Sequence, residues 1–209
     1  MKKILITQRL KEHSDYFEEQ EALDISWGEL FNEIGFLPIV LPYEYDFKNY
    51  FREFKIDGIL LTGGNDLSLF HRSRLSEKRD DFELKLIDAA IKNSIPIFGV
   101  CRGMQIIAHY FKSSFKSVEN QVNTKHTLVV NQSSKYAKYL NMIEEVNSFH
   151  NFAVESVSEE FLISASDKNG VIKAIEHKKY KIFAQMWHSE RVHPFNAEEL
   201  ELMKVFFND

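Results

Sequence analysis

The sequence predicts an α/β protein: a mostly parallel central sheet, helices on both faces, and a smaller antiparallel strand region in the second half. Short β-branched runs alternate with helical patterns in the first half, which is typical of a parallel sheet wrapped by helices. The chain has 209 residues, of which 44% are hydrophobic and 27% charged, as in ordinary globular proteins. From about Val118 the strand-like runs are separated by turn residues. We expect one domain, residues 1–209.

The first half contains four short apolar runs that we expect to form buried parallel strands. They are Ile4–Thr7, Ile39–Leu41, Gly58–Thr62 and Ile97–Val100.

Amphipathic patterns between and after these runs predict helices that lie on the sheet. The patterns cover Ile25–Ile34, Phe82–Ile91 and, at the end of the chain, Ala197–Phe207. Asp80 and Asp81 precede the second pattern, and we expect them to cap that helix at its N-terminus.

The second half predicts shorter strands with turns between them. The turn Lys168-Asn169-Gly170 is of the kind found in hairpins. The expected strands are Thr127–Asn131, Val154–Val157, Leu162–Ala165, Gly170–Ile175 and Lys181–Met186.

Charge and cysteine content exclude several classes of protein. The net charge of −5 argues against holding nucleic acid or an anionic membrane through the overall field of the molecule. The single cysteine, Cys101, rules out an intramolecular disulfide and a multi-cysteine metal site. No apolar run is long enough to cross a membrane, and the first residues lead into a strand. We expect a cytoplasmic protein.

The segment Gly99-Val100-Cys101-Arg102-Gly103 predicts a nucleophile elbow. A buried strand ends at a cysteine that has a glycine two residues away on either side, as in Gly-x-nucleophile-x-Gly. The glycines allow a tight, strained turn, and the helix expected to begin near Arg102 directs its N-terminal dipole at the sulfur. Both features favour the thiolate form of the cysteine.

A cysteine nucleophile needs a base, and His188 is the best placed of the eight histidines. It follows the strand-like run Lys181–Trp187, and Glu190 lies two residues further on. If the chain stays extended there, the two side chains project to the same face and can touch.

A pair of glycines, Gly63 and Gly64, follows the buried run Gly58–Thr62 and therefore lies at the sheet edge from which Cys101 emerges. The backbone N–H groups of Gly64 and Arg102 are candidates for an oxyanion hole.

These residues together resemble the class I glutamine amidotransferase superfamily, and within it the γ-glutamyl-γ-aminobutyrate hydrolase branch, peptidase family C26. The motifs that carry the resemblance occur in collinear order over most of the chain: Leu61–Asp66, Arg79-Asp80 with Glu83, Gly99–Gln105, Val146–His150 and Trp187–Glu190. Ser189 departs from the family by replacing the usual proline between the histidine and the glutamate.

The resemblance implies a flavodoxin-like three-layer fold and a Cys101–His188–Glu190 triad that cleaves a γ-glutamyl amide through a thioester. It implies no metal and no cofactor. The expected partner is a small-molecule γ-glutamyl substrate, and a homodimer is compatible with the sequence. The resemblance also places five residues around the glutamyl group: Gly63, Asn65, Gln105, Ser148 and His150.

The motifs describe the glutamyl half of the substrate and say less about the leaving group. The reaction of one compact member of this branch, γ-glutamyl-CDP-amidate to glutamate and cytidine diphosphoramidate in capsule synthesis, is the best specific expectation. A basic stretch, His71–Arg74 with Lys78 and Arg79, is compatible with a phosphate-bearing leaving group, although Arg79 is expected to pair internally. The alternatives are a γ-glutamyl-GABA-type hydrolase of amine catabolism, a glutaminase subunit that supplies ammonia to a synthetase, and an idle scaffold.

Overall fold

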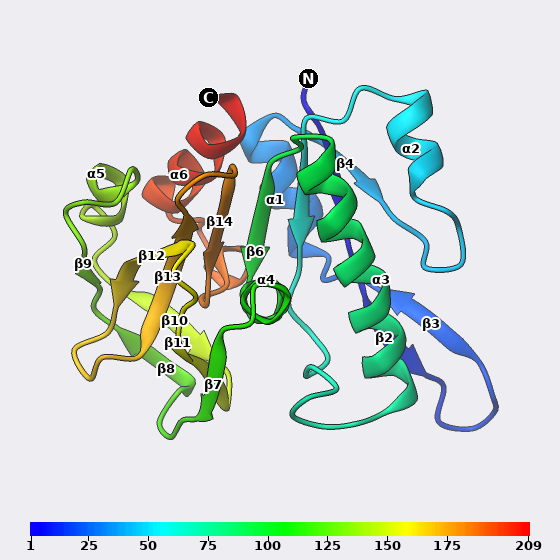
Figure 1. Ribbon diagram of the computed structural model, residues 1–209, viewed down its shortest axis with the longest axis horizontal. Coiled ribbons are helices and arrows are strands. Elements are labelled where there is room, and N and C mark those ends of the chain that lie inside the picture. The colour runs from blue at the N-terminus through cyan, green and yellow to red at the C-terminus, as the bar shows by residue number, and fades with distance from the viewer.

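A computed structural model describes residues 1–209, and its centre is an eight-stranded sheet (Figure 1). The strand order is β4-β1-β5-β6-β14-β13-β12-β9. The first five of these strands are parallel to one another and the last three extend the sheet in antiparallel fashion. The predicted fold class is confirmed. The strands are β4 (Leu37–Val40), β1 (Lys3–Ile6), β5 (Gly58–Leu61), β6 (Ile97–Val100), β14 (Ile182–Gln185), β13 (Ile172–His177), β12 (Phe161–Ser166) and β9 (Val129–Val130).

The return of β14 to the middle of the sheet is the feature that matters most for function. It lies parallel to β6, with Ile182 opposite Ile97 and Gln185 opposite Val100. The carboxyl ends of the two strands therefore lie side by side. Residues that follow β6 and β14 meet at this edge although they are far apart in the sequence.

Helices cover both faces of the sheet. Successive residues of β5 point to opposite sides, so that Ile59 and Leu61 belong to one buried apolar cluster and Leu60 to the other. The first cluster packs against α2 (Lys48–Glu53), α3 (Arg74–Lys92) and α4 (Arg102–Tyr110); the second packs against α1 (Ser26–Ile34), α5 (Ala137–Leu140) and α6 (Ala197–Asn208).

Helix α3 starts earlier than the sequence predicted. It begins at Arg74, and the side chain of Ser73 caps it by accepting a hydrogen bond from the Ser76 N–H. The expectation that Asp80 and Asp81 form the cap is wrong, because both lie inside the helix. Charged residues fill the first two turns of α3, so the periodicity of apolar residues could not indicate that the helix begins there.

The hairpin turn at Lys168–Gly170 is confirmed: it joins β12 to β13, and Gly170 adopts a positive φ of 78°. In contrast, the predicted strand Thr127–Asn131 shrinks to the two residues of β9. The expected strand Val154–Val157 corresponds to β11 (Phe152–Ser156), but the other strands of the three two-stranded antiparallel sheets and the helices α2 and α5 were not predicted. The small sheets pair β2 (Arg9–Glu12) with β3 (Glu19–Ala22), β7 (Ser114–Ser117) with β11, and β8 (Val122–His126) with β10 (Val146–Phe149).

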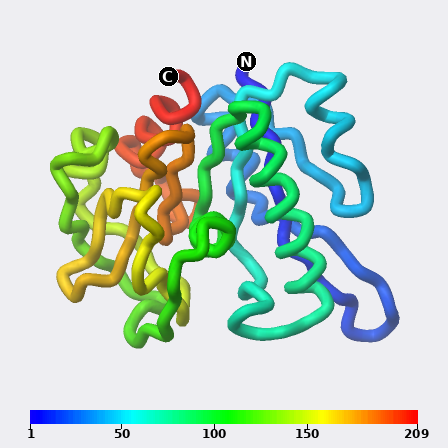
Figure 2. The backbone as a smooth tube through the Cα atoms, viewed as in Figure 1, coloured from blue at the N-terminus to red at the C-terminus, as the bar shows by residue number.

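Both ends of the chain lie at the same end of the molecule (Figure 2). There the Lys2 ammonium donates a hydrogen bond of 2.5 Å to the Phe207 carbonyl, which links β1 to α6. No helix is both long and apolar enough to span a bilayer.

Candidate active site

The predicted elbow is present between β6 and α4. Cys101 lies at the N-cap of α4 with φ 54° and ψ −106°, a strained backbone conformation for a residue other than glycine, which costs about 1–3 kcal/mol. A Cβ atom on Gly103 would lie 2.0 Å from the Leu61 carbonyl oxygen, and one on Gly99 would lie 2.8 Å from the Gly103 carbonyl oxygen. Only glycine fits at these two positions, since the helix packs directly on the strands.

His188 and Glu190 form the hydrogen bond that their spacing predicted, with 2.6 Å between Nδ1 and Oε1. The predicted extended conformation is wrong beyond His188, because Ser189–Arg191 form one turn of 3₁₀ helix. The turn brings the carboxylate back toward the imidazole. Both side chains are buried. Nδ1 is occupied by the carboxylate, so Nε2 is the ring nitrogen left free for Cys101.

Gly63 lies against both His188 and Cys101. A Cβ atom on Gly63 would lie 2.7 Å from His188 Cε1 and 3.6 Å from Cys101 Cβ. Any side chain there would push the imidazole out of place. The glycine loop after β5 therefore forms one wall of the site.

Two negative neighbours set the charge of His188. Burial disfavours the imidazolium, but the Cys101 sulfur and the Glu190 carboxylate outweigh it and raise the pKa of His188 to about 9. His188 is thus protonated at neutral pH. A protonated imidazole beside a cysteine can give its proton to a departing group.

The two candidate oxyanion-hole amides lie at the ends of neighbouring strands. The Gly64 N–H donates no hydrogen bond within the chain, and Gly64 has a positive φ of 131°. Arg102 is the first residue of α4, and its N–H has no carbonyl of a preceding helical turn to donate to. Both N–H groups are therefore available to a ligand.

A buried charge network under the site holds the glycine loop and the elbow helix. The Arg79 guanidinium donates to the carbonyl oxygens of Gly63 (3.1 Å) and Thr62 (2.8 Å) and pairs with Glu83 (3.0 Å). Arg102 pairs with both Glu83 and Asp80. Burial opposes ionisation of Glu83, but the two guanidinium groups hold its pKa below the usual range. The internal pairing predicted for Arg79 is confirmed, with Glu83 as its partner.

The residues predicted to bind the glutamyl group lie in two places. The Asn65 amide is engaged by the backbone of Leu10 on β2, with bonds of 3.0 and 2.9 Å, which favours a role in fixing the β2–β3 hairpin. Gln105 and His150 instead converge on the Phe152 carbonyl oxygen, to which they donate at 2.9 and 3.1 Å. Ser148 lies beside His150, with 3.1 Å between Oγ and Nε2.

The sequence analysis assigned no role to two residues that form hydrogen bonds around Ser148 and His150. Asn147 makes two hydrogen bonds of 2.8 Å to the backbone of His188 and so ties β10 to the triad. Lys173 lies fully buried on β13 and contacts Ser148 and His150. A lysine inside the otherwise apolar run that became β13 is a signal that could have found it.

Each side chain of the basic stretch that carries nitrogen contacts a carboxylate. His71 contacts Asp66 at 2.7 Å and Arg72 contacts Glu77 at 2.6 Å. Arg74 and Lys78 each contact two glutamates, and Arg79 is buried with Glu83. The stretch therefore leaves no unpaired cation for a phosphate. The remaining partners are Glu12 and Glu19 for Arg74, and Glu19 and Glu44 for Lys78.

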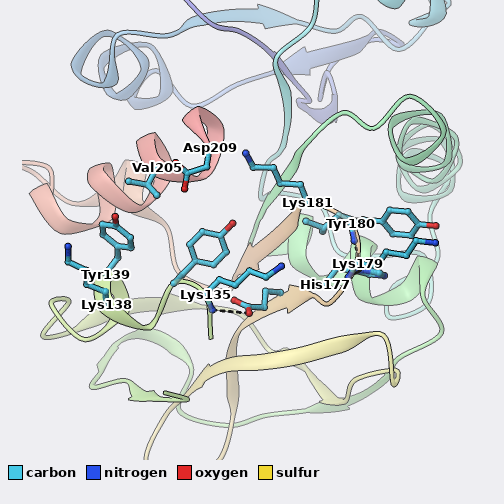
Figure 3. A pocket seen from close by; sticks show the side chains of 12 residues that line it. Lys135, Lys138, Tyr139, His177, Lys179, Tyr180, Lys181, Val205 and Asp209 are labelled. Atoms are coloured by element: carbon cyan, nitrogen blue, oxygen red, sulfur yellow. Dashed lines mark hydrogen bonds between the residues drawn. The ribbon is translucent and has the colours of Figure 1, made fainter. Parts of the chain in front are cut away.

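A separate cavity of about 540 Å³ lies between α5, α6 and the start of β14 (Figure 3). Four lysines and three tyrosines are among its lining residues. It is at the amino end of β14, whereas His188 follows the carboxyl end, and its lining includes none of Cys101, His188 and Glu190. Nowhere do three or more histidine, cysteine or acidic side chains gather in a way that could hold a metal ion.

Comparison with known proteins agrees with this geometry. The family model described as Peptidase C26 matches residues 4–190. A γ-glutamyl-CDP-amidate hydrolase from Campylobacter jejuni is 38% identical over 206 residues, which cover 97% of this chain and 96% of the relative. A glutamine-hydrolysing GMP synthase from Brachyspira hyodysenteriae is 28% identical over 71% of this chain but only 27% of its own length.

Solved structures show the same fold at low sequence identity. A Thermoplasma acidophilum protein described as one of the subunits of GMP synthase superposes with a TM-score of 0.74 at 21% identity, covering 99% of this chain and 92% of its own. A glutamine amidotransferase from Thermotoga maritima gives 0.65 at 14% identity, covering 98% and 83%.

Proposed function

The chain belongs to the peptidase C26 family, and from this membership and the geometry of its site we propose that it hydrolyses γ-glutamyl-CDP-amidate to glutamate and cytidine diphosphoramidate. The observation that carries the chemistry is the buried hydrogen bond of 2.6 Å between His188 and Glu190 beside the elbow cysteine. The choice of leaving group is supported by the Campylobacter relative, which matches nearly end to end. The basic stretch adds no support, since its cations are paired.

In the first half of the reaction, the Cys101 thiolate attacks the γ-carbonyl carbon of the substrate. The N–H groups of Gly64 and Arg102 stabilise the oxyanion that forms, and each such donor typically contributes roughly 10²–10³ in rate. The His188 imidazolium gives its proton to the departing nitrogen as the C–N bond breaks. A glutamyl thioester on Cys101 remains.

Acylation also changes the histidine. The negative charge of the sulfur, which helps to raise the pKa of His188, is consumed in the thioester. The neutral imidazole can now take a proton from water, which attacks the thioester and releases glutamate. Glu190 holds the imidazole in the required tautomer throughout, as triad carboxylates do.

The reaction needs a small-molecule substrate. We expect the enzyme in the cytoplasm, where its single cysteine stays reduced, and we expect no part for nucleic acid or membrane in its work. A homodimer is compatible with the proposal, and a molar mass measured in solution decides between it and a monomer of 24.5 kDa.

Glutamate release from a panel of γ-glutamyl compounds tests the proposal. We expect release from γ-glutamyl-CDP-amidate and a loss of roughly 10⁴–10⁶ in kcat for Cys101→Ala. The panel also contains γ-glutamyl-GABA and glutamine. Preference for γ-glutamyl-GABA would make the enzyme a hydrolase of amine conjugates, and glutamine turnover only with an added synthetase would make it a glutaminase subunit. If no compound of the panel released glutamate, the proposal would be contradicted.

A further inference from the structure

The cavity between α5, α6 and the start of β14 is lined by cations that have no carboxylate partner (Figure 3). Its volume of about 540 Å³ lies within the range of about 300–1,000 Å³ that is typical of small-molecule sites. Four lysines line it and none of them forms an ion pair, although acidic residues outnumber basic ones in this protein. These lysines are Lys135, Lys138, Lys179 and Lys181.

The larger cavity, of about 1080 Å³ between α2 and α3, shows the contrast. Three of the four cations in its lining form ion pairs at the protein surface, so most of its positive charge is already neutralised. The pairs are Arg52 with Glu53, Lys85 with Asp81, and Lys92 with Asp88. The cavity beside α5 and α6 is therefore the one that can offer several unpaired cations to a ligand.

Two carboxylates also line the cavity beside α5 and α6, but neither pairs with a lysine side chain. Glu176 is buried, and its oxygens already accept hydrogen bonds from two serine hydroxyls and from the Lys135 backbone N–H. Asp209 is exposed. Burial lowers the pKa of Lys181, and the attraction of Asp209 opposes this shift without reversing it. The lining thus keeps an excess of positive charge, which attracts an anion.

The tyrosines of the lining suit a ligand that also carries a planar ring. Tyr136 and Tyr180 pack against other aromatic side chains, whereas the partly exposed ring of Tyr139 packs against none. The Lys138 ammonium lies over the Tyr139 ring, 5.7 Å from its centroid. An aromatic base stacked on Tyr139 therefore has a cation beside it, and such stacking tolerates any base because every base has a π-face.

The lysines reach the cavity from two separate segments. Lys135 and Lys138 belong to the start of α5, and Lys179 and Lys181 to the turn between β13 and β14. Figure 3 shows Lys138 and Lys179 at opposite sides of the cavity. A ligand with more than one phosphate can contact both segments, whereas a bare phosphate has no group that would use the tyrosine ring.

We propose that this cavity binds a nucleoside polyphosphate, with the phosphates at the lysines of the two segments and the base on Tyr139. The site lies at the amino end of β14, away from Cys101 and His188. The proposal therefore does not depend on the reaction that the enzyme catalyses.

Isothermal titration of the full chain with ADP tests the proposal, with pyrophosphate and adenosine as the two halves of the probe. We expect ADP to bind with a Kd below about 100 µM, and each half to bind at least about 10-fold more weakly. Lys135→Gln and Lys181→Gln should each weaken ADP binding roughly 5- to 20-fold. Tyr139→Leu keeps an apolar side chain but removes the flat ring, and it should weaken ADP binding roughly 5-fold or more.

Lys178→Gln is the matched control, since Lys178 lies in the same turn as Lys179 but outside the cavity lining, and it should bind ADP as the wild type does. Because Lys135 is exposed, its substitution leaves the fold intact and the test stays decisive. The absence of saturable ADP binding would overturn the proposal. Unchanged affinity in the three cavity variants would also overturn it, because ADP would then bind elsewhere, as would pyrophosphate binding as tightly as ADP.

Discussion

In the proposed reaction, the charge of one side chain, His188, decides which of the two steps can proceed. Its imidazole is protonated at neutral pH, because the Cys101 sulfur and the Glu190 carboxylate raise its pKa to about 9 against the effect of burial. The proton that the proposed mechanism gives to the leaving group is therefore on His188 before substrate binds.

This charge state predicts the alkaline limit of activity. Since the pKa of His188 is raised to about 9 and the protonated form is needed for acylation, kcat/KM for glutamate release should fall as pH rises above about 9. Glu190→Gln removes one of the two charges that raise this pKa, so the fall should begin at lower pH and the rate should be reduced. A pH profile with the same alkaline limb in both proteins would contradict this reading of Glu190.

At the scale of a single element, α3 does more than cover the sheet. One of its faces packs against the apolar core through Phe82, Leu86 and Ile87, and another carries the acidic partners of two buried arginines. The helix thus connects the glycine loop after β5 with the first residue of α4.

Breaking that network should be costly. Glu83→Gln leaves Arg79 buried without its carboxylate and removes one of two partners from Arg102, so we expect a loss of about 3–5 kcal/mol in the free energy of unfolding. Urea denaturation measures it. Asp81→Asn on the same helix is the control, because Asp81 pairs with Lys85 at the exposed surface, where such a pair contributes about 0–1 kcal/mol. Equal, small effects would mean that the buried pairs do not stabilise the fold.

The elements show which parts of the site a sequence can reveal. Cys101 and the Gly63-Gly64 pair were predictable because glycines mark their turns, and His188 with Glu190 because they lie two residues apart. Lys173 is marked only as a lysine in an apolar run; its partners were not predictable, since they come from the segment before β8 and from β10. Only the pairing of distant strands brings these residues together. The start of α3 could not be predicted for a related reason: its charged residues Arg74 and Lys78 pair with glutamates that are distant in sequence.

At the scale of the whole molecule, the last helix, α6, contacts the residue next to His188. Glu199 on α6 is buried and accepts a hydrogen bond of 3.1 Å from the Trp187 indole, next to His188 in sequence. Burial raises the pKa of Glu199 to about 7, although contacts with Ser189 and Trp187 oppose this shift. The folded protein therefore keeps a proton that the unfolded chain releases near pH 4.5.

This proton links global stability to pH. The stabilising effect of protonated Glu199 is complete below about pH 4.5 and is lost as pH rises to about 7. Glu199→Gln cannot ionise, so its melting temperature relative to wild type should be higher at pH 8 than at pH 5. Calorimetry at the two values measures this difference, with Glu201→Gln, an exposed position on the same helix, as the control. A difference that does not depend on pH would refute the role of Glu199.

The parallel pairing of β14 with β6 also bears on how such enzymes diverge. Cys101 and His188 follow adjacent strands, while α4, the β7–β11 and β8–β10 sheets and the antiparallel extension lie between them in sequence. A lineage can lengthen, shorten or replace loops in that intervening stretch without shifting either residue. The relative placement of Cys101 and His188 is thereby independent of how the stretch of chain between them is built.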